Sequence, residues 1–197
     1  VDIDFINLKL DYILKNDIFL FQLEIPFNTV EFCIEKIKEF QRVSGQEKII
    51  ILDPAPAIPL KDEVLKCVDY ITPNETEIEI LTGIRIGNED DIKKASLLLL
   101  DKGVKTVIAK AGGKGAYIVE RNKFVHISAP EVKVVDTTAA GDSFNAGFAF
   151  SLSQNKDPED CVKFANMVAS LAVTAKGAQE AMPDMEQVQD FINKILS

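Results

Sequence analysis

The sequence contains little cysteine and almost no histidine. The three cysteines, Cys33, Cys67 and Cys161, lie far apart in a chain of 197 residues, and the single histidine, His126, has no cysteine near it. This pattern gives neither the paired ligands of a zinc site nor an even-numbered disulfide framework. We therefore expect a reduced, cytoplasmic compartment and a structural role for His126.

Long apolar runs and an excess of basic residues are also missing. The longest apolar runs, such as 49–52 and 97–100, are far shorter than the roughly 20 residues of a membrane helix. The chain has 22 basic and 31 acidic residues and a net charge of −9. Because this field repels phosphate backbones, we expect no nucleic acid as partner. Because the apolar runs are short, we expect no membrane either. A polyanionic ligand would need a cation, a lysine or a helix N-terminus at its site.

The composition is that of an ordinary globular protein, with 47% hydrophobic and 27% charged residues. The first strand-like run appears only near Ile18, and strands then alternate with helical patterns. The expected strands are 18–23, 48–52, 70–72 and 106–110, with a hairpin of 116–120 and 124–128; the expected helices are 28–44, 62–67, 74–82, 90–102, 141–153, 158–175 and 185–196. Asn28 and Asp157 are the expected caps of two of these helices. The alternation predicts one α/β domain over residues 1–197, with a mostly parallel sheet covered by helices on both faces.

The most informative segment is 135–147, VDTTAAGDSFNAG. Its small residues Ala139, Ala140 and Gly141 stand where a helix is expected to begin, so free N–H groups and the positive end of the helix dipole would face an anion. Asp142, in the first turn, could accept a proton from an attacking hydroxyl. The alternative is structural: Asp142 only complements the helix dipole, and Asp136 caps the turn.

Three other features also allow two interpretations. Asn74 and Glu77 have the spacing of a capping box, in which each side chain satisfies a backbone donor. The segment 110–115, KAGGKG, could be a phosphate-side loop or a plain tight turn. Asn166 could contact a ligand or be a polar residue on the surface.

Residues 135–147 resemble the second signature of the ribokinase-like (phosphofructokinase-B type) carbohydrate kinases. Four further segments resemble ribokinases in order and spacing: 21–26 (FQLEIP), 53–56 (DPAP), 72–77 (TPNETE) and 176–179 (KGAQ). The resemblance covers nearly the entire chain. It implies a ribokinase-like fold and ATP-dependent phosphorylation of the primary hydroxyl of a sugar, with D-ribose expected. Deoxyribose, fructose or a nucleoside remain alternatives, as does a nucleotide-binding module without catalysis.

The resemblance also assigns roles to individual residues. It implies that Asp142 is the catalytic base and that Glu24 contacts the sugar with it. The residues implied for the anion hole are Ala139, Ala140 and Gly141. The residues implied for ATP are Asn74, Lys110, Gly112, Lys114, Gly115, Gly141, Asp142 and Asn166.

Two cations are implied as well. Glu77 would hold Mg²⁺ through water, and a monovalent cation such as K⁺ would lie in a loop formed by Asp136, Thr138, Ala172, Ala175 and Gly177. This sequence departs from the family at Lys110, where ribokinases often have threonine, and at Ala181, where they can offer a serine hydroxyl.

The chain is shorter than ribokinase-like chains usually are. The resemblance makes it the C-terminal two thirds of the usual chain, without the N-terminal part that brings most sugar contacts and a lid that pairs subunits. We therefore expect a homodimer for the full-length protein. We also expect this portion alone to bind Mg–ATP weakly and to show negligible ribose-dependent turnover.

Overall fold

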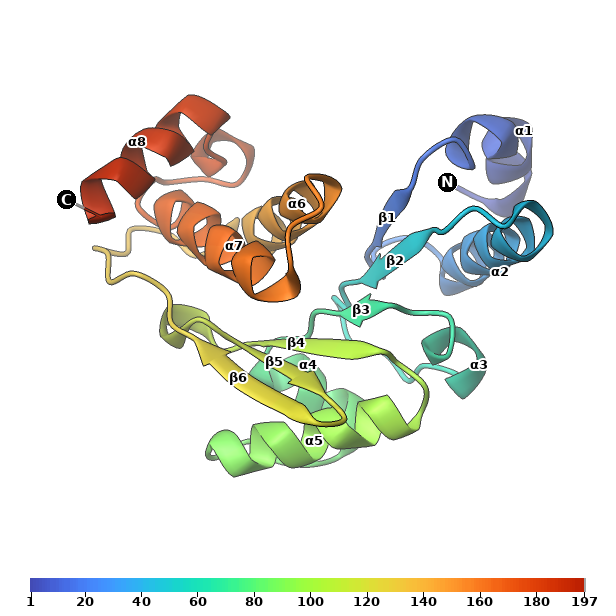
Figure 1. Ribbon diagram of the computed structural model, residues 1–197, viewed down its shortest axis with the longest axis horizontal. Helices are drawn as coiled ribbons and strands as arrows, with labels where there is room; N and C mark the ends of the chain where they lie inside the picture. The colour runs from blue at the N-terminus through green and yellow to red at the C-terminus, as the bar shows by residue number, and fades with distance from the viewer. Residues whose placement is uncertain (197) are drawn as a thin grey trace. The chain divides into compact units, whose positions relative to one another are not determined.

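The computed structural model describes residues 1–196 (Figure 1). It divides into two compact units, the first made of residues 1–110 with 119–124, and the second of 111–118 with the residues from 125 onward. One sheet has six strands in the order β1-β2-β3-β4-β5-β6. Its strands are β1 (Ile18–Phe21), β2 (Ile49–Leu52), β3 (Tyr70–Ile71), β4 (Thr106–Lys110), β5 (Ala116–Glu120) and β6 (Lys123–Ile127). The predicted α/β fold with a mostly parallel sheet is confirmed.

The first four strands are parallel and belong to the first unit. Ile18 pairs with Ile49, Ile51 with Tyr70, and Tyr70 with Thr106. Strand β2 is an uninterrupted apolar run that is almost fully buried, as expected of a strand covered on both faces. The carboxyl ends of these four strands therefore meet at one edge of the sheet.

Helices connect these strands. They are α1 (Ile3–Ile13), α2 (Phe27–Ser44), α3 (Asp62–Leu65), α4 (Glu75–Thr82) and α5 (Glu89–Asp101). In α2, Val30, Cys33, Ile34 and Ile37 repeat at helical spacing and are buried, and Gly45 ends the helix in the left-handed conformation. The predicted Asn28 cap is wrong, because α2 begins at Phe27 after Pro26, so Asn28 lies within its first turn.

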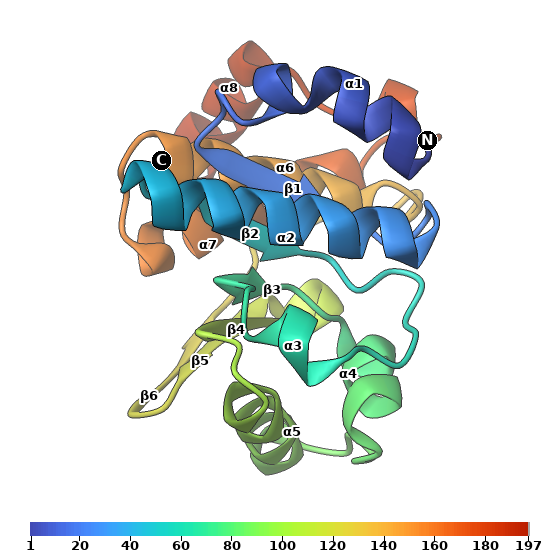
Figure 2. The same ribbon diagram turned by 90° about the vertical axis from the view of Figure 1, so that its right-hand side faces the viewer.

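Helix α1 was not expected from the sequence. Asp2 caps it by accepting a hydrogen bond from the N–H of Phe5, and the helix lies beside α2 (Figure 2). Ile6 is its single buried residue, whereas Phe5 and Leu8 are exposed. Its less exposed apolar residues, Ile3, Ile6, Leu10 and Ile13, recur at helical spacing, and the exposed Phe5 and Leu8 obscure this pattern in the sequence.

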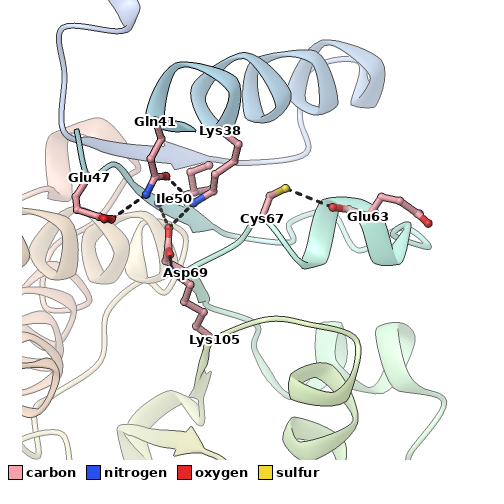
Figure 3. A network of polar contacts seen from close by, with 8 residues as sticks. All are labelled: Lys38, Gln41, Glu47, Ile50, Glu63, Cys67, Asp69 and Lys105. Atoms are coloured by element: carbon pink, nitrogen blue, oxygen red, sulfur yellow. Dashed lines mark hydrogen bonds and ion pairs between the residues drawn. The ribbon is translucent and has the colours of Figure 1, made fainter. Parts of the chain in front are cut away.

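A buried carboxylate joins elements at the amino ends of the strands (Figure 3). Asp69, just before β3, accepts hydrogen bonds from the N–H of Ile50 at 2.8 Å and from Lys38 Nζ at 3.3 Å. Its other oxygen pairs with Lys105 Nζ at 2.6 Å. One side chain thus ties α2, β2, β3 and the segment before β4, and its hydrogen bond and then its charge raise the pKa of Lys105.

The second unit is mainly helical. Its helices are α6 (Ala140–Ser153), α7 (Pro158–Ala172) and α8 (Met185–Leu196), with short 3₁₀ turns at Gly112–Lys114 and Gln179–Ala181. Asp157 caps α7 and Pro158 is its first residue, as predicted, but the helix ends at Ala172 instead of continuing to 175. Helices α6 and α7 approach closely at Gly147, where a Cβ would lie 3.1 Å from Val168. Throughout residues 1–196, no helix has the length and apolar character needed to cross a membrane.

Candidate active site

Asn74 and Glu77 form a complete capping box at the start of α4. Asn74 Oδ1 accepts from the N–H of Glu77 at 2.9 Å, and Glu77 Oε2 accepts from the N–H of Asn74 at 2.8 Å. Asn74 Nδ2 also donates to Glu77 Oε1 at 2.8 Å. The structural interpretation of this pair is therefore confirmed. The same bonds fix a carboxylate at the carboxyl end of β3, where ligands of parallel sheets bind.

Burial raises the pKa of Glu77, and the negative charge of Asp53 raises it further. The hydrogen bond from the Asn74 backbone and the positive charge of Lys110 act in the opposite direction. Glu77 is 8% exposed. Its ionisation thus depends on charges carried by the ends of the neighbouring strands.

Lys110 is already paired within the protein. Its Nζ lies 3.0 Å from Asp53 Oδ1, and the two side chains are 12% and 3% exposed. Asp53 Oδ2 accepts a second bond from Gln22 Nε2 at 3.3 Å. Asp53 lies in a segment that resembles ribokinases, but the sequence indicated no role for it, because its ion pair joins residues 57 positions apart.

Two further residues follow strands of this unit. Glu24 is exposed in the bend after β1. Thr72 follows β3, is fully buried, and its hydroxyl finds no hydrogen-bond partner among residues 1–196.

In the second unit, the glycine-rich segment forms a tight turn after β4. The N–H of Ala111 donates to the carbonyl of Gly115 at 2.8 Å, and Gly112–Lys114 is a 3₁₀ turn. His126 lies 2.8 Å through its Nε2 from the Lys114 carbonyl and stacks on Tyr117 with ring centroids 4.5 Å apart. The tight-turn interpretation is thus correct in geometry, and His126 helps hold the turn.

The start of α6 carries the most informative segment of the sequence. Ala139 is the N-cap residue, is buried, and gives no side-chain cap bond. Asp142 is exposed in the first turn, and the N–H of Ala140 donates to the Thr137 carbonyl at 3.1 Å. The helix therefore presents backbone N–H groups and a positive dipole end beside a carboxylate.

Asn166 is 4% exposed, so the interpretation of it as a surface residue is wrong. Its Nδ2 donates to the carbonyl of Ile127 at 2.9 Å and lies 3.4 Å from that of Ser128. Its amide thus anchors the end of β6 to α7.

Asp136 is the centre of a loop cluster in the second unit. Its Oδ1 accepts from the hydroxyl of Thr138 at 2.6 Å and from the Thr138 N–H at 3.0 Å, and its Oδ2 accepts from the N–H of Gly177 at 3.0 Å. These bonds lower the pKa of Asp136 to about 2, with the Thr138 hydroxyl contributing most. Asp136 therefore does cap its turn. Ala172 and Ala175 are joined by a bond of 3.2 Å from the Ala175 N–H to the Ala172 carbonyl.

No cluster of three or more histidine, cysteine or acidic side chains suited to a metal occurs within residues 1–196.

A sequence profile described as pfkB family carbohydrate kinase matches residues 6–185. The chain belongs to this family. As a pfkB family chain, it has its glycine-rich turn, its capping box and the start of α6 all inside the matched range.

Individual relatives agree with this assignment. The chain is 39% identical over 180 residues to a ribokinase of Haemophilus influenzae, with 91% of this chain and 57% of the relative covered. It is 38% identical over 180 residues to a deoxyribokinase of Salmonella typhi, with 91% and 57% covered. The chain thus spans less than two thirds of the length of these pfkB family relatives.

Solved structures show the same fold. The Arabidopsis thaliana ribokinase complexed with ribose and ATP matches with a TM-score of 0.86 and 35% identity, covering 93% of this chain and 58% of that one. A ribokinase from Thermotoga maritima matches with a TM-score of 0.82 and 40% identity, covering 93% and 59%. The predicted ribokinase-like fold is confirmed.

Proposed function

We propose that the polypeptide carrying this sequence transfers the γ-phosphoryl group of ATP to the primary hydroxyl of a sugar, with D-ribose as the first candidate. Its pfkB family membership and its similarity to named ribokinases support this proposal. The observation that carries it is the position of Asp142 in the first turn of α6, directly after Ala139, Ala140 and Gly141, on a helix with no side-chain cap.

Asp142 has the chemistry of a general base. As the sugar oxygen forms its bond to the γ-phosphorus and the bond to the β-phosphate oxygen breaks, the Asp142 carboxylate accepts the hydroxyl proton. The N–H of Gly141 and the positive end of the α6 dipole then stabilise the negative charge that develops. Glu24 is the second residue proposed to contact the sugar.

Nucleotide contacts are proposed for the residues that the resemblance implies for ATP. Asn74 and Lys110 would lie beside the phosphates, and Gly112, Lys114, Gly115 and Asn166 would line the nucleotide. Because Lys110 is paired with Asp53 and Asn166 with backbone carbonyls, these two residues would act mainly through the backbone that they hold.

The donor set at Glu77 fits Mg²⁺ held through water. Carboxylate oxygens are the hard ligands that Mg²⁺ prefers. Each Glu77 oxygen accepts one bond from Asn74 and keeps a second lone pair, which can accept a bond from the water of a hydrated ion. When bound, Mg²⁺ neutralises charge on the β- and γ-phosphates. For the loop of Asp136, Thr138, Ala172, Ala175 and Gly177 we propose a monovalent cation such as K⁺, supported by the direct bonds that bring Asp136, Thr138 and Gly177 together.

Deoxyribose is the second candidate substrate. The deoxyribokinase relative is as similar to this chain as the ribokinase relative, at 38% against 39% identity over 180 residues each. ADP release by the full polypeptide, measured with D-ribose, with 2-deoxy-D-ribose and without sugar, separates the two. A wild-type protein that binds ADP but forms no ADP from ATP with either sugar would instead favour a nucleotide-binding module.

The proposed role of Asp142 is tested by Asp142→Asn, which keeps the shape of the side chain but removes the base. We expect sugar-dependent ADP release to fall by roughly 100- to 10,000-fold, while the Kd for ADP changes by less than about threefold. Asp160→Asn, on the exposed start of α7, is the matched control and should leave both quantities unchanged. Retention of more than about a tenth of the wild-type rate by Asp142→Asn would contradict the role.

A further inference from the structure

The ion pair of Asp53 and Lys110 spans three neighbouring strands. Asp53 directly follows β2 and Lys110 ends β4, while β3 lies between them in the sheet. Both side chains are largely removed from water, with 3% and 12% exposed. In such a setting, removal of one partner leaves the other as a buried and unpaired charge.

Lys110 also holds the loop that leads to the capping box. Its backbone N–H donates to the carbonyl of Pro73 at 2.8 Å, and it forms a parallel bridge with Asn74. Asn74 in turn makes three hydrogen bonds with Glu77. A shift of the Lys110 backbone would therefore be passed to both residues of the capping box.

Asp53 fixes the other side of this arrangement. Its backbone N–H donates to the carbonyl of Phe21 at 2.8 Å, and its carboxylate accepts from Gln22 as well as from Lys110. The pair thus connects the carboxyl ends of β1, β2 and β4 with the start of α4.

The charges point the same way as the geometry. Asp53 and Glu77 are two buried carboxylates at one sheet edge, and Lys110 is the cation that acts on both. Replacement of Lys110 by a neutral residue would leave Asp53 and Glu77 without their neighbouring cation. Simultaneous replacement of Asp53 by a neutral residue would restore the net charge of the group.

We infer that Asp53 and Lys110 form one positioning unit, which holds the Asn74–Glu77 capping box in the geometry that receives a Mg²⁺–nucleotide. This inference rests on the proposed function, because it concerns the same nucleotide. Neither residue needs to touch the nucleotide. Each acts through the backbone and the charge balance of the strand ends, so the two depend on each other.

The test compares Lys110→Met, Asp53→Asn and the double variant. Calorimetric titration gives the Kd for ADP with Mg²⁺ and with EDTA, and thermal unfolding reports whether each variant is folded. We expect each single variant to weaken Mg²⁺–ADP binding by about tenfold and binding in EDTA by less than threefold. The double variant, which leaves neither Asp53 nor Lys110 as a buried charge without its partner, should bind Mg²⁺–ADP within about threefold of the wild type.

Lys61→Met is the matched control, since it breaks an exposed ion pair with Glu31 in the same unit and should change neither Kd. Single variants that bind Mg²⁺–ADP like the wild type would overturn the inference. So would a double variant that binds no better than the weaker single variant. If a single variant fails to fold, recovery of folding and of Mg²⁺–ADP binding in the double variant supports the unit, and its failure overturns it.

The wild type separates this inference from the proposed function. A wild-type protein with no measurable ADP binding would sink both. Normal ADP binding that is insensitive to all three substitutions would overturn the positioning unit alone.

Discussion

The carboxylate of Asp136 accepts a hydrogen bond of 3.0 Å from the backbone N–H of Gly177, a residue 41 positions later in the chain. Together with Thr138, this bond joins the segment before α6 to the segment after α7. Because the bonds favour the ionised form, the pKa of Asp136 falls from 3.8 to about 2. The hydrogen bonds of Asp136 in this loop therefore make a pH-dependent contribution to the stability of the fold.

Asp136→Asn should remove that contribution. A group with a lowered native pKa stabilises the fold above its unfolded pKa of 3.8, and this effect is lost as the pH falls through about 2. We expect the melting temperature of the variant to lie below that of the wild type from pH 7 to 4. The gap should close towards pH 2, as measured by circular dichroism in a tetramethylammonium buffer without potassium.

Thr138→Val is the matched control for this prediction. It keeps the carboxylate but loses the hydroxyl that lowers its pKa most. The pH-dependent part of the stability should then be smaller, and its loss in acid should be complete at a higher pH than in the wild type. A gap between wild type and Asp136→Asn that stays constant from pH 7 to 2 would contradict the assignment.

Gly115 should tolerate no side chain. Its φ is +99°, and a Cβ would collide with the carbonyl oxygen of Ile127 and lie 2.6 Å from the N of Ala129. We expect Gly115→Ala to lower the free energy of unfolding in urea by about 2 kcal/mol or more. Gly113→Ala, two residues earlier, meets no atom within 4 Å and should change it by less than about 0.5 kcal/mol. Equal effects of the two substitutions would refute the close approach.

Asp69→Asn should destabilise the first unit. It removes the charge that pairs with Lys38 and Lys105, although the amide oxygen can still accept from Ile50. We expect a loss of about 2 kcal/mol in the free energy of unfolding, since hydrogen bonds to a buried charge are stronger than neutral ones. Asp101→Asn, which breaks an exposed pair with Arg121, is the control and should have no measurable effect. A tolerated Asp69→Asn would show that the network contributes little.

Thr72→Val tests the unpartnered hydroxyl at the end of β3. Valine has nearly the same shape but places no polar group in this buried position. We therefore expect the free energy of unfolding in urea to equal that of the wild type or to exceed it by up to about 1 kcal/mol. Thr82→Val is the opposite case, because the Thr82 hydroxyl donates to the Ile78 carbonyl at 2.6 Å. This control should lose about 1 kcal/mol. A clear loss in Thr72→Val would mean that its hydroxyl does find a partner.

Local patterns in the sequence predicted most of the fold. Buried strands showed as short apolar runs, and the Asn74–Glu77 spacing predicted a capping box that the structure contains. Helix α1 was missed, although Asp2 as a cap and Ile6, Leu10 and Ile13 at helical spacing were signals that could have revealed it.

The candidate site was only partly accessible from sequence. The start of α6 could be read because its small residues and Asp142 are contiguous. The pairing of Asp53 with Lys110 could not, because it depends on which strand ends become neighbours in the folded sheet. The interpretation of Asn166 as a surface residue was wrong for the same reason. An isolated polar residue in a helical pattern does not indicate which backbone carbonyls it will bond in the folded protein.

The parallel pairing of β1 to β4 also has a consequence for synthesis on the ribosome. Strands β2, β3 and β4 each pair with the strand that was made just before them, and none is inserted later between two existing neighbours. A growing chain can therefore extend the sheet in the order of translation, closing one crossover at a time. We expect stalled nascent chains of increasing length to gain protease resistance in steps, one for each completed strand and helix.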